Sequence, residues 1–482
     1  MIKEWLSIYQ EDQPNKFNEE IIYGLREKDS MISYLEDVCL ALESIPYIKY
    51  NGYDIITNEN DLRQTSTISI TDSRLDLITF KFTLSFKDQV KNITMPLFIP
   101  KWINKYYFIL NGNKYFPIYQ NVESSTYNAK DSVVLKSLLM PIIVKMKNTV
   151  IKDKNNKEYS GKLFMVNLFE HKTNFLLYYF STFGFTETLK FFKYDKYIRF
   201  KKSKKNKKEK VLLFPINKND NIIVNKSKFL NDNNFRNFVI SLKDLLTSKT
   251  NLEKIDDTEY WLIKLGGVFT KNTNNQLNKA ETVLLSFKRI LDNRTKKNLL
   301  LDNEDKEDIY HLIRWMINNF DRLMKQDNLS LLNKRLRLSE YIITPFVRKM
   351  SNSTYRILNS KTLTFNKFES IMKPSPTIII SELQKSKLLR FNNATNDMDL
   401  FNCALKWSNR GPSALGEGSK KTVSIYYRGI HPSHLGRISL NSCSNSDPGM
   451  TGLLSPFIKT NGFYYSYTGD IDEGEENGLY DN

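Results

Sequence analysis

The residues best suited to chemistry lie in one stretch near the C-terminal end of the chain, residues 410–457. Glycine and proline are dense in this stretch, which predicts ordered loops rather than a long helix or strand. Loops that fix cations in defined turns suit the positioning of groups around a polyanion or an active centre. For each cation the alternative is a structural ion pair within the loop. The cations are Arg410, Lys420, Lys421, Arg428 and Arg437.

Two histidines lie in the same stretch, and three interpretations of them remain open. His431 and His434 are spaced like a pair of metal ligands, but no third or fourth ligand accompanies them in the sequence. The sequence favours packing and hydrogen bonding within the loop, and the third interpretation is a position near the substrates. Upstream, Ser413 begins the run Ser-Ala-Leu-Gly, which predicts a tight turn where Gly416 lets the backbone approach nucleic acid.

The same residue types limit the chemistry that this chain can perform alone. Nucleotidyl transfer by two metal ions needs clustered aspartates together with cations for the triphosphate. The sequence offers the cations but no clustered carboxylates. It therefore predicts that this chain binds no metal and does not catalyse on its own.

Length, charge and cysteine content limit the classes of protein to which this chain can belong. The chain has 482 residues and a formal net charge of +18, from 71 basic and 53 acidic residues. The length predicts two to four domains, and the charge favours an anionic partner such as nucleic acid. The three cysteines, Cys39, Cys403 and Cys443, are far apart, which predicts neither a zinc ribbon nor a disulfide framework. No apolar run approaches the roughly 18 residues that span a bilayer, so no membrane segment is expected.

Local patterns predict the elements near the N-terminus that must support this stretch. Ser30 is expected to cap a helix whose apolar residues recur at helical spacing from Met31 to Leu42. Residues 79–87 alternate apolar and polar side chains, which is typical of a half-buried strand. Asn111 and Gly112 predict the type I′ turn of a hairpin, because both tolerate a positive φ.

Two amphipathic helices are expected later in the chain. Apolar residues recur at helical spacing between Leu277 and Leu291, and again between Ile309 and Leu323. Acidic residues precede the second helix, where the helix dipole favours them. His311 lies within that helix and is expected to be structural.

The C-terminal stretch resembles the fork region of the β subunit of multisubunit, bacterial-type RNA polymerases. In the family this region reads Ser-Ala-Leu-Gly, then Arg-x-x-His-Pro-(Thr/Ser)-His-(Tyr/Leu)-Gly-Arg. The second run is long and unusual, so the match is specific. The residues that carry the resemblance are Ser413 to Gly416, Arg428, His431 to Arg437, and Gly452 with Leu453.

Two further motifs resemble the same subunit in the same order. Met-Pro-Leu at 95–97 and Phe-Ile-Leu-Asn-Gly at 108–112 resemble the β-subunit protrusion, although an ordinary hairpin is the alternative. Residues 333–340 resemble Asn-Arg-Arg-Val-Arg-x-x-Gly-Glu, with which the family re-enters the protrusion. Arg335 and Arg337 in that motif would contact nucleic-acid phosphates or, equally, pair with acidic neighbours.

The resemblance implies an α+β, multidomain fold, in which a protrusion with an inserted lobe is followed by a loop-rich fork region. The expected boundaries are 1–119 for the first part of the protrusion, 120–328 for the lobe, 329–385 for the second part of the protrusion, 386–460 for the fork region, and 461–482 for an acidic C-terminal tail at the split point.

The resemblance also implies a function, a catalytic-core subunit of a DNA-dependent RNA polymerase. The chain stops soon after the fork motif, and this length predicts the N-terminal half of a split β subunit, as encoded by jumbo bacteriophages. Mg²⁺ would be bound by a partner β′ subunit and not by this chain. The expected partners are the C-terminal β fragment, β′ fragments, a promoter-specificity subunit, the DNA template and the RNA transcript, with no membrane. The expected location is the cytoplasm of the infected bacterial host, or the virion if the enzyme is packaged.

The resemblance places four residues near the active centre, namely Arg437, Asp447, Met450 and His434. Residues 442–450 depart from the family's Glu-Thr-Pro-Glu-Gly-Pro-Asn, and Asp447 is the only acid there to replace the glutamates. Two roles are open for Arg437: it contacts the triphosphate or the RNA end, or it pairs locally and holds the shape of the fork.

Two other classes of protein remain as alternatives to a polymerase subunit. A basic phage protein that holds DNA or RNA without joining a polymerase would bind nucleic acid stably by itself. A structural or virion protein with a chance motif would show neither DNA binding nor polymerase partners. Co-purification with the other polymerase fragments separates the three.

Overall fold

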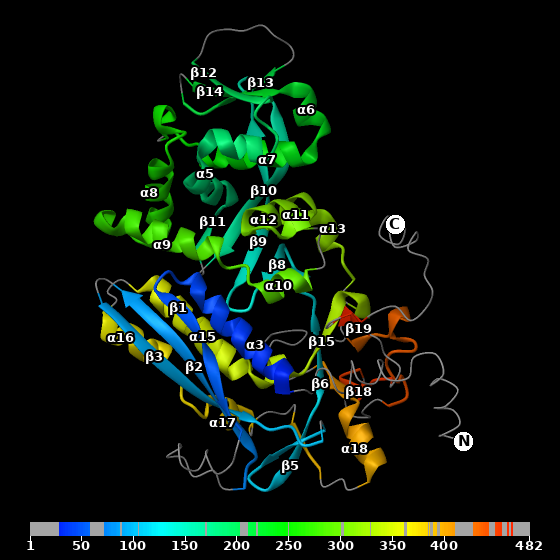
Figure 1. The fold of residues 1–482 in the computed structure, drawn as a ribbon. Coiled ribbons are helices and arrows are strands. Elements are labelled where there is room, and N and C mark those ends of the chain that lie inside the picture. The colour runs from blue at the N-terminus through cyan, green and yellow to red at the C-terminus, as the bar shows by residue number, and fades with distance from the viewer. Residues whose placement is uncertain are drawn as a thin grey trace.

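The computed structural model joins helices to largely antiparallel sheets, as the α+β class predicts (Figure 1). The domain boundaries stay predictions, and the acidic tail lies almost wholly outside the described residues. The structure describes residues 28–57, 72–86, 89–104, 106–168, 171–202, 211–217, 220–248, 250–299, 303–327, 329–360, 364–383, 385, 389–392, 396–409, 428–442, 449–455, 460–461 and 464–465.

One sheet from the N-terminal part packs against helices from a distant part of the chain. Strands β1 (Ile48–Ile56), β2 (Leu75–Phe86) and β3 (Gln89–Pro100) are antiparallel, and α15 (Thr344–Asn359), α16 (Phe365–Met372) and α17 (Ile378–Leu383) lie beside them (Figure 1). The ring of Phe346 stacks on that of Phe80, with 6.5 Å between the centroids. The backbone N–H of Phe98 donates to the carbonyl of Pro376. Residues 48–100 and 344–383 therefore share one core.

The local predictions for the N-terminal part are largely confirmed. In β2, Phe82 and Leu84 are buried and Lys81 is exposed, as the alternation predicts. Helix α3 (Lys28–Ala41) buries the predicted apolar face, and the 3₁₀ turn η3 (Leu42–Ser44) follows it. The predicted cap is wrong, because the helix begins at Lys28 and Ser30 lies inside its first turn.

The predicted hairpin is also confirmed. Strands β4 (Phe108–Leu110) and β5 (Asn113–Pro117) pair across Asn111 and Gly112, whose φ angles are +50° and +75°. These are the two positive φ angles that a type I′ turn requires. Strand β16 (Leu389–Phe391) pairs with β5 and completes a three-stranded sheet.

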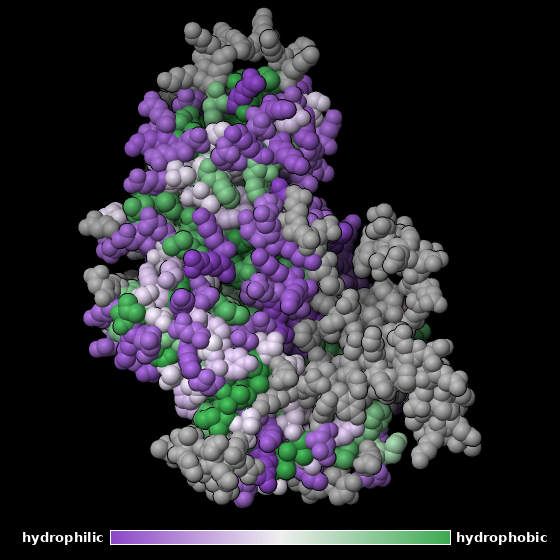
Figure 2. Space-filling model, viewed as in Figure 1, coloured by the Kyte–Doolittle hydropathy of each residue, from purple (hydrophilic) through white to green (hydrophobic). Residues whose placement is uncertain are grey.

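A second body follows, built on five antiparallel strands. In spatial order they are β11 (His171–Asn174), β10 (Glu158–Leu168), β9 (Pro141–Lys152), β8 (Ser132–Lys136) and β7 (Thr126–Ala129). Helices α5 (Phe175–Phe191) and α7 (Asn233–Leu245) pack on this sheet. At the far end lies a smaller sheet of β12 (Ile198–Lys202), β14 (Asp220–Asn225) and β13 (Val211–Pro215), beside α6 (Lys226–Asn231). Hydrophilic residues dominate that end of the face in Figure 2.

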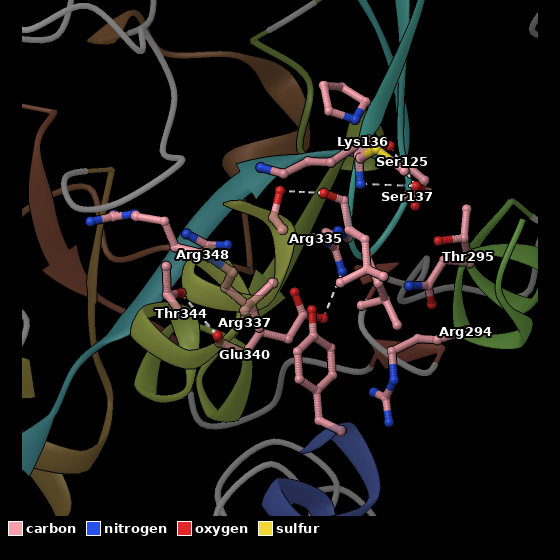
Figure 3. Close-up of a pocket in the computed structure, with 18 of the residues that line it drawn as sticks. Ser125, Lys136, Ser137, Arg294, Thr295, Arg335, Arg337, Glu340, Thr344 and Arg348 are labelled. Carbon is pink, nitrogen blue, oxygen red and sulfur yellow. Dashed lines mark hydrogen bonds and ion pairs between the residues drawn. The ribbon is translucent and has the colours of Figure 1, made fainter. Parts of the chain in front are cut away.

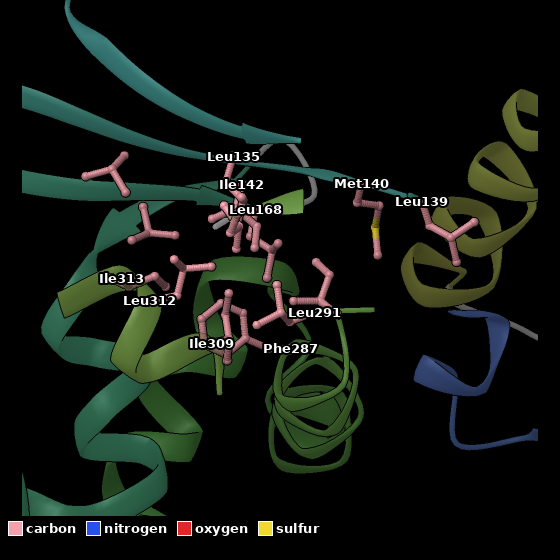
Figure 4. Packing of buried hydrophobic residues seen from close by; sticks show 14 of the residues in the cluster. Leu135, Leu139, Met140, Ile142, Leu168, Phe287, Leu291, Ile309, Leu312 and Ile313 are labelled. Atoms are coloured by element: carbon pink, nitrogen blue, oxygen red, sulfur yellow. The ribbon is translucent and has the colours of Figure 1, made fainter. Parts of the chain in front are cut away.

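Six more helices close the second body. They are α8 (Thr258–Phe269), α9 (Gln276–Lys288), α10 (Asn293–Asn298), α11 (Asn303–Lys306), α12 (Ile309–Asn318) and α13 (Phe320–Met324), with the 3₁₀ turns η4 (Leu252–Lys254) and η5 (Thr273–Asn275). Figure 4 shows Phe287 of α9 and Leu312 of α12 packing beneath Ile142 of β9. The prediction of a single helix over 309–323 is wrong, because the helix is interrupted at Asn319 (φ −100°, ψ 14°). The predicted apolar residues are nevertheless buried.

The third assembly is a six-stranded sheet that draws on distant parts of the chain. Its spatial order is β18 (Thr451–Leu453), β17 (Lys406–Ser408), β6 (Tyr119–Glu123), β15 (Lys334–Arg337), β20 (Tyr464–Tyr465) and β19 (Thr460–Asn461). Strand β17 runs parallel to β6, and the other pairs are antiparallel. Helices α14 (Ser339–Ile342) and α18 (Asp397–Ala404) adjoin it in sequence. This sheet positions the motifs that the sequence singled out.

Candidate nucleic-acid interface

Strand β15 lies at the centre of the candidate interface, and all four of its residues are buried. Successive side chains in a strand point to opposite faces, so Arg335 and Arg337 share one face of the sheet. Lys334 stands opposite Glu123 on β6, with 2.7 Å between Nζ and Oε2. Arg337 stands opposite Gln120, and its Nε donates to Oε1 at 2.5 Å.

Arg335 pairs with a carboxylate from the following helix. Its Nη1 lies 2.7 Å from Oε1 of Glu340 on α14, and both side chains are almost fully buried. Burial acts to raise the pKa of Glu340, but the charges of Arg335, Arg337 and Arg294 outweigh it and hold the pKa below its usual value. Glu340 is therefore ionised at neutral pH and close to three guanidinium groups.

Residues 431–434 form a short 3₁₀ turn, η8 (Pro432–His434), which the histidines brace. The ring Nδ1 of His431 accepts from the backbone N–H of Ser433 at 3.1 Å, and its Nε2 lies 3.3 Å from Oδ2 of Asp327. The ring Nε2 of His434 lies 3.1 Å from the carbonyl oxygen of Leu329. These contacts are those expected of loop packing and hydrogen bonding.

The turn is bonded to the segment that leads into β15. The backbone N–H of Leu331, in the 3₁₀ turn η6 (Leu331–Asn333), donates to Oγ of Ser433 at 2.9 Å. Burial lowers the pKa of His434, with the Leu329 carbonyl opposing this shift and the charge of His431 adding to it. The neutral ring fits its surroundings, since one nitrogen faces a carbonyl and the other faces the backbone N–H of His431 at 3.4 Å.

Arg437 turns back onto the same loop. Its Nη1 donates to the carbonyl of Ser433 at 3.0 Å, and the residue is only 7% exposed. Its own carbonyl accepts from the backbone N–H of Ser455 at 2.8 Å. Gly436 before it has a φ of +71°, a conformation that glycine adopts without strain.

Residues 449–453 attach the loop to the six-stranded sheet. Met450 is buried, and its carbonyl accepts from the backbone N–H of Asn409. The side chain of Asn409 donates to the carbonyl of Gly449 at 3.0 Å and accepts from Asn121 of β6 at 3.2 Å. Arg428 is half-buried and packs closely against Gly449. The loop is thus held in place by contacts with β6, by the end of β17 and by β18.

A family described as non-virion RNA polymerase subunit matches residues 7–475, nearly the whole chain. The chain belongs to this family. As a subunit of an RNA polymerase it is part of a nucleotidyltransferase complex, and other polymerase subunits are its partners. Among curated proteins, none matches this polymerase subunit in sequence.

Some of the site residues predicted from the sequence are described by the structure, and others are not. The structure brings the 334–337 motif next to the 431–437 run, and it buries Arg335 and Arg337 beside named partners instead of presenting them on an outer surface. Five predicted residues lie outside the described residues, so their placement stays a prediction: Arg410, Ser413, Lys420, Lys421 and Asp447.

Sequence reasoning missed a cavity that Arg335 and Arg337 line (Figure 3). Three further cations line it, namely Lys136 at the end of β8, Arg294 of α10 and Arg348 of α15. None of the three lies in a motif that the sequence singled out, so no local signal marks them. Only the packing of distant segments brings them together.

Neither a metal-binding cluster nor a membrane-spanning helix is found in the described part of the polymerase subunit. Within it, no group of three or more His, Cys, Asp or Glu residues is arranged to hold a metal ion. No helix in that part is both long and apolar enough to cross a bilayer. The described cysteines, Cys39 and Cys403, are buried and free.

Proposed function

We propose that this polymerase subunit is the N-terminal half of a split β subunit and forms part of the DNA channel and of the fork beside the active centre. It would act in template-directed RNA synthesis only when assembled with the C-terminal β fragment and the β′ fragments. In this proposal the β′ partner binds the catalytic Mg²⁺, and this chain supplies cations that position nucleic acid.

One observation carries the proposal. Two segments that resemble β-subunit motifs lie about a hundred residues apart in the sequence, yet the residues just before the first are hydrogen-bonded to the second. Leu331 and Leu329, just before the first motif, contact Ser433 and His434 of the second. A chance match in an unrelated protein gives no reason for the two motifs to meet, so this contact supports the β-like assignment.

The partners and the location follow from the same proposal. A promoter-specificity subunit, the DNA template and the RNA transcript complete the working enzyme. The family's description favours the non-virion alternative, in which the enzyme acts in the cytoplasm of the infected host instead of being packaged.

Co-purification tests the assembly. The chain would be tagged during infection, and the recovered complex would be assayed for RNA synthesis on a promoter template. We expect stoichiometric chains that carry the missing β half and β′-like aspartates. Recovery of the chain alone with bound DNA or RNA would instead support the alternative, a non-catalytic nucleic-acid-binding protein.

Site-specific photo-crosslinking tests the position of the fork. A photoreactive amino acid at Lys421 in the assembled polymerase is expected to crosslink to the template or the transcript. The control position is Lys190 on α5, which is exposed in the second body. Equal crosslinking from both positions would contradict a specific place for residues 410–437 beside the nucleic acid.

A further inference from the structure

Helix α15 presents a row of basic and amide side chains on its outer face. Arg348, Asn352 and Arg356 are exposed and follow one another at four-residue spacing, so they lie on the same face of the helix. Lys349 is half-buried and lies beside them. These four residues are termed the α15 row, and α15 itself contains no aspartate or glutamate. The row is about 12 Å long, since a helix rises 1.5 Å per residue.

Ion pairing does not account for the α15 row. Elsewhere an exposed helical lysine of this chain pairs with an acid one turn away, as Lys190 does with Glu187 on α5. Such pairs are the ordinary arrangement on a solvated helix face. Within the part of the chain that the structure describes, no acid pairs with Arg348, Lys349 or Arg356. Their charges are therefore not balanced by a described partner.

The helix dipole accounts for only one of these cations. Arg356 lies in the last turn of α15, where the free carbonyl ends favour a positive charge. Arg348 and Lys349 lie in the N-terminal half of the helix, where the dipole does not favour cations. Local electrostatics thus gives no reason for a row of three cations along this face, whereas an external anion does.

The opposite face of α15 holds the row in place. The ring of Phe346 stacks on that of Phe80, with 6.5 Å between the centroids, and Met350 is fully buried. The hydroxyl of Ser353 donates to the carbonyl of Ile371 on α16 at 2.9 Å. The helix lies along the β1–β3 sheet (Figure 1). Because the backbone of the row is already fixed by this packing, it loses little conformational entropy when a ligand binds.

We propose that the α15 row binds the sugar–phosphate backbone of a nucleic acid. Phosphate oxygens accept charge-assisted hydrogen bonds from guanidinium and ammonium groups, and asparagine side chains contact them as well. Phosphates of one strand follow each other about every 3.4 Å along the axis, so a row of about 12 Å spans three or four of them. An RNA polymerase handles such strands, as DNA template and as RNA product. The inference concerns a different element from β15 and the 428–442 loop, and it does not rest on the split-β assignment.

Binding measurements on the full chain test this surface. A duplex DNA and a single-stranded RNA, each in two unrelated sequences, would be titrated between about 50 mM and about 200 mM salt. Arg348→Gln/Arg356→Gln is the test variant. Arg322→Gln/Lys271→Gln is the matched control, because it removes the same charge from two exposed residues of the second body. Circular dichroism would confirm that both variants fold as the parent does.

We expect the test variant to bind both sequences of a probe about tenfold more weakly, which is the scale of one charge-assisted hydrogen bond. The slope of log K against log salt should become shallower by about 1.8 on the duplex or about 1.4 on the single strand, since each phosphate contact contributes about 0.9 or about 0.7. A loss on the duplex identifies the DNA as the ligand, and a loss confined to the single strand identifies the RNA. The control variant should keep the parent's slope.

A charge-preserving variant provides a second check. Arg348→Lys/Arg356→Lys keeps both charges, so its salt slope should match that of the parent. The proposal is overturned if neither probe binds, if the glutamine variant keeps the parent's slope, if the control variant loses as much, or if the lysine variant loses the slope too. Displacement of the nucleic acid by polyglutamate at equal charge would assign the row to an acidic protein and would also overturn it. These outcomes do not depend on which subunits co-purify, so failure here is distinguishable from failure of the proposed function.

Discussion

Lys334 on β15 and Glu123 on β6 form a buried ion pair directly across two neighbouring strands, with 2.7 Å between Nζ and Oε2. Their side chains are 2% and 16% exposed. Burial raises the pKa of Glu123 and lowers that of Lys334, and each charge partly offsets the shift of the other. The pair therefore joins the two central strands of the sheet that carries the candidate interface.

Removing one partner of the Lys334–Glu123 pair should lower the stability of the fold. We expect Lys334→Met to lower the free energy of unfolding by about 3 kcal/mol, because Glu123 would be left buried without its counter-charge. Adding Glu123→Leu should recover much of the loss, because the remaining charge is then removed too. Urea unfolding measures both. Lys81→Met is the control, since its pair with Asp54 is exposed, and an equal loss there would contradict the expectation.

Adjacent glycines in α8 should differ sharply. A methyl group at Gly266 would overlap the backbone carbonyl of Gln276 at the start of α9. One at Gly267 would lie 3.7 Å from the side-chain nitrogen of Gln276, an ordinary contact distance. We expect Gly266→Ala to destabilise the chain by about 2 kcal/mol through overpacking. Gly267→Ala should stabilise it by up to about 1 kcal/mol, because alanine favours the helix. Thermal unfolding of the two variants gives the comparison, and similar shifts would argue against close packing of α8 on α9.

The loop at residues 428–442 should loosen in mild acid. The pKa of His434 is lowered from 6.5, chiefly by burial, so the folded state binds fewer protons than the unfolded state. The stability contributed by neutral His434 is therefore complete above about pH 6.5 and is lost as the pH falls towards the folded pKa. Hydrogen exchange of residues 428–442, corrected for intrinsic rates, should show less protection at about pH 5.5 than at about pH 7.5. His434→Gln should remove this difference, and its persistence in that variant would assign it to another group.

Arg437 is expected to hold the shape of the loop. Because it is buried and donates to the carbonyl of Ser433, Arg437→Ala should cost about 1–3 kcal/mol and expose residues 428–442 to hydrogen exchange. Arg437→Lys keeps the charge and loses the planar fork, so partial recovery is expected. The direct role predicts a different result, namely normal protection with nucleotide addition slowed about 10²-fold in the assembled polymerase. Arg322→Ala serves as the surface control.

The local elements and the order of the motifs were predictable from the sequence alone. The alternation in β2 and the Asn111-Gly112 turn depend on side-chain period and on φ preferences, which act between neighbouring residues. The apolar faces of α3 and α12 were predictable for the same reason. The ends of these helices were not predictable, since Ser30 lies inside α3 and Asn319 separates α12 from α13. Tertiary packing sets such boundaries and can override local propensity.

The partners of the cations near residue 335 depend on the folding of distant segments against β15. In the sequence, these cations could contact nucleic-acid phosphates or, equally, pair with acidic neighbours, and the fold makes Lys334, Arg335 and Arg337 part of a buried strand. The partners of Lys334 and Arg337, namely Glu123 and Gln120, lie more than two hundred positions away. The energy of a buried charge depends on those distant partners, and no local pattern encodes them. The cavity that Arg335 and Arg337 line has the same origin, because it exists only where separate segments of the chain meet.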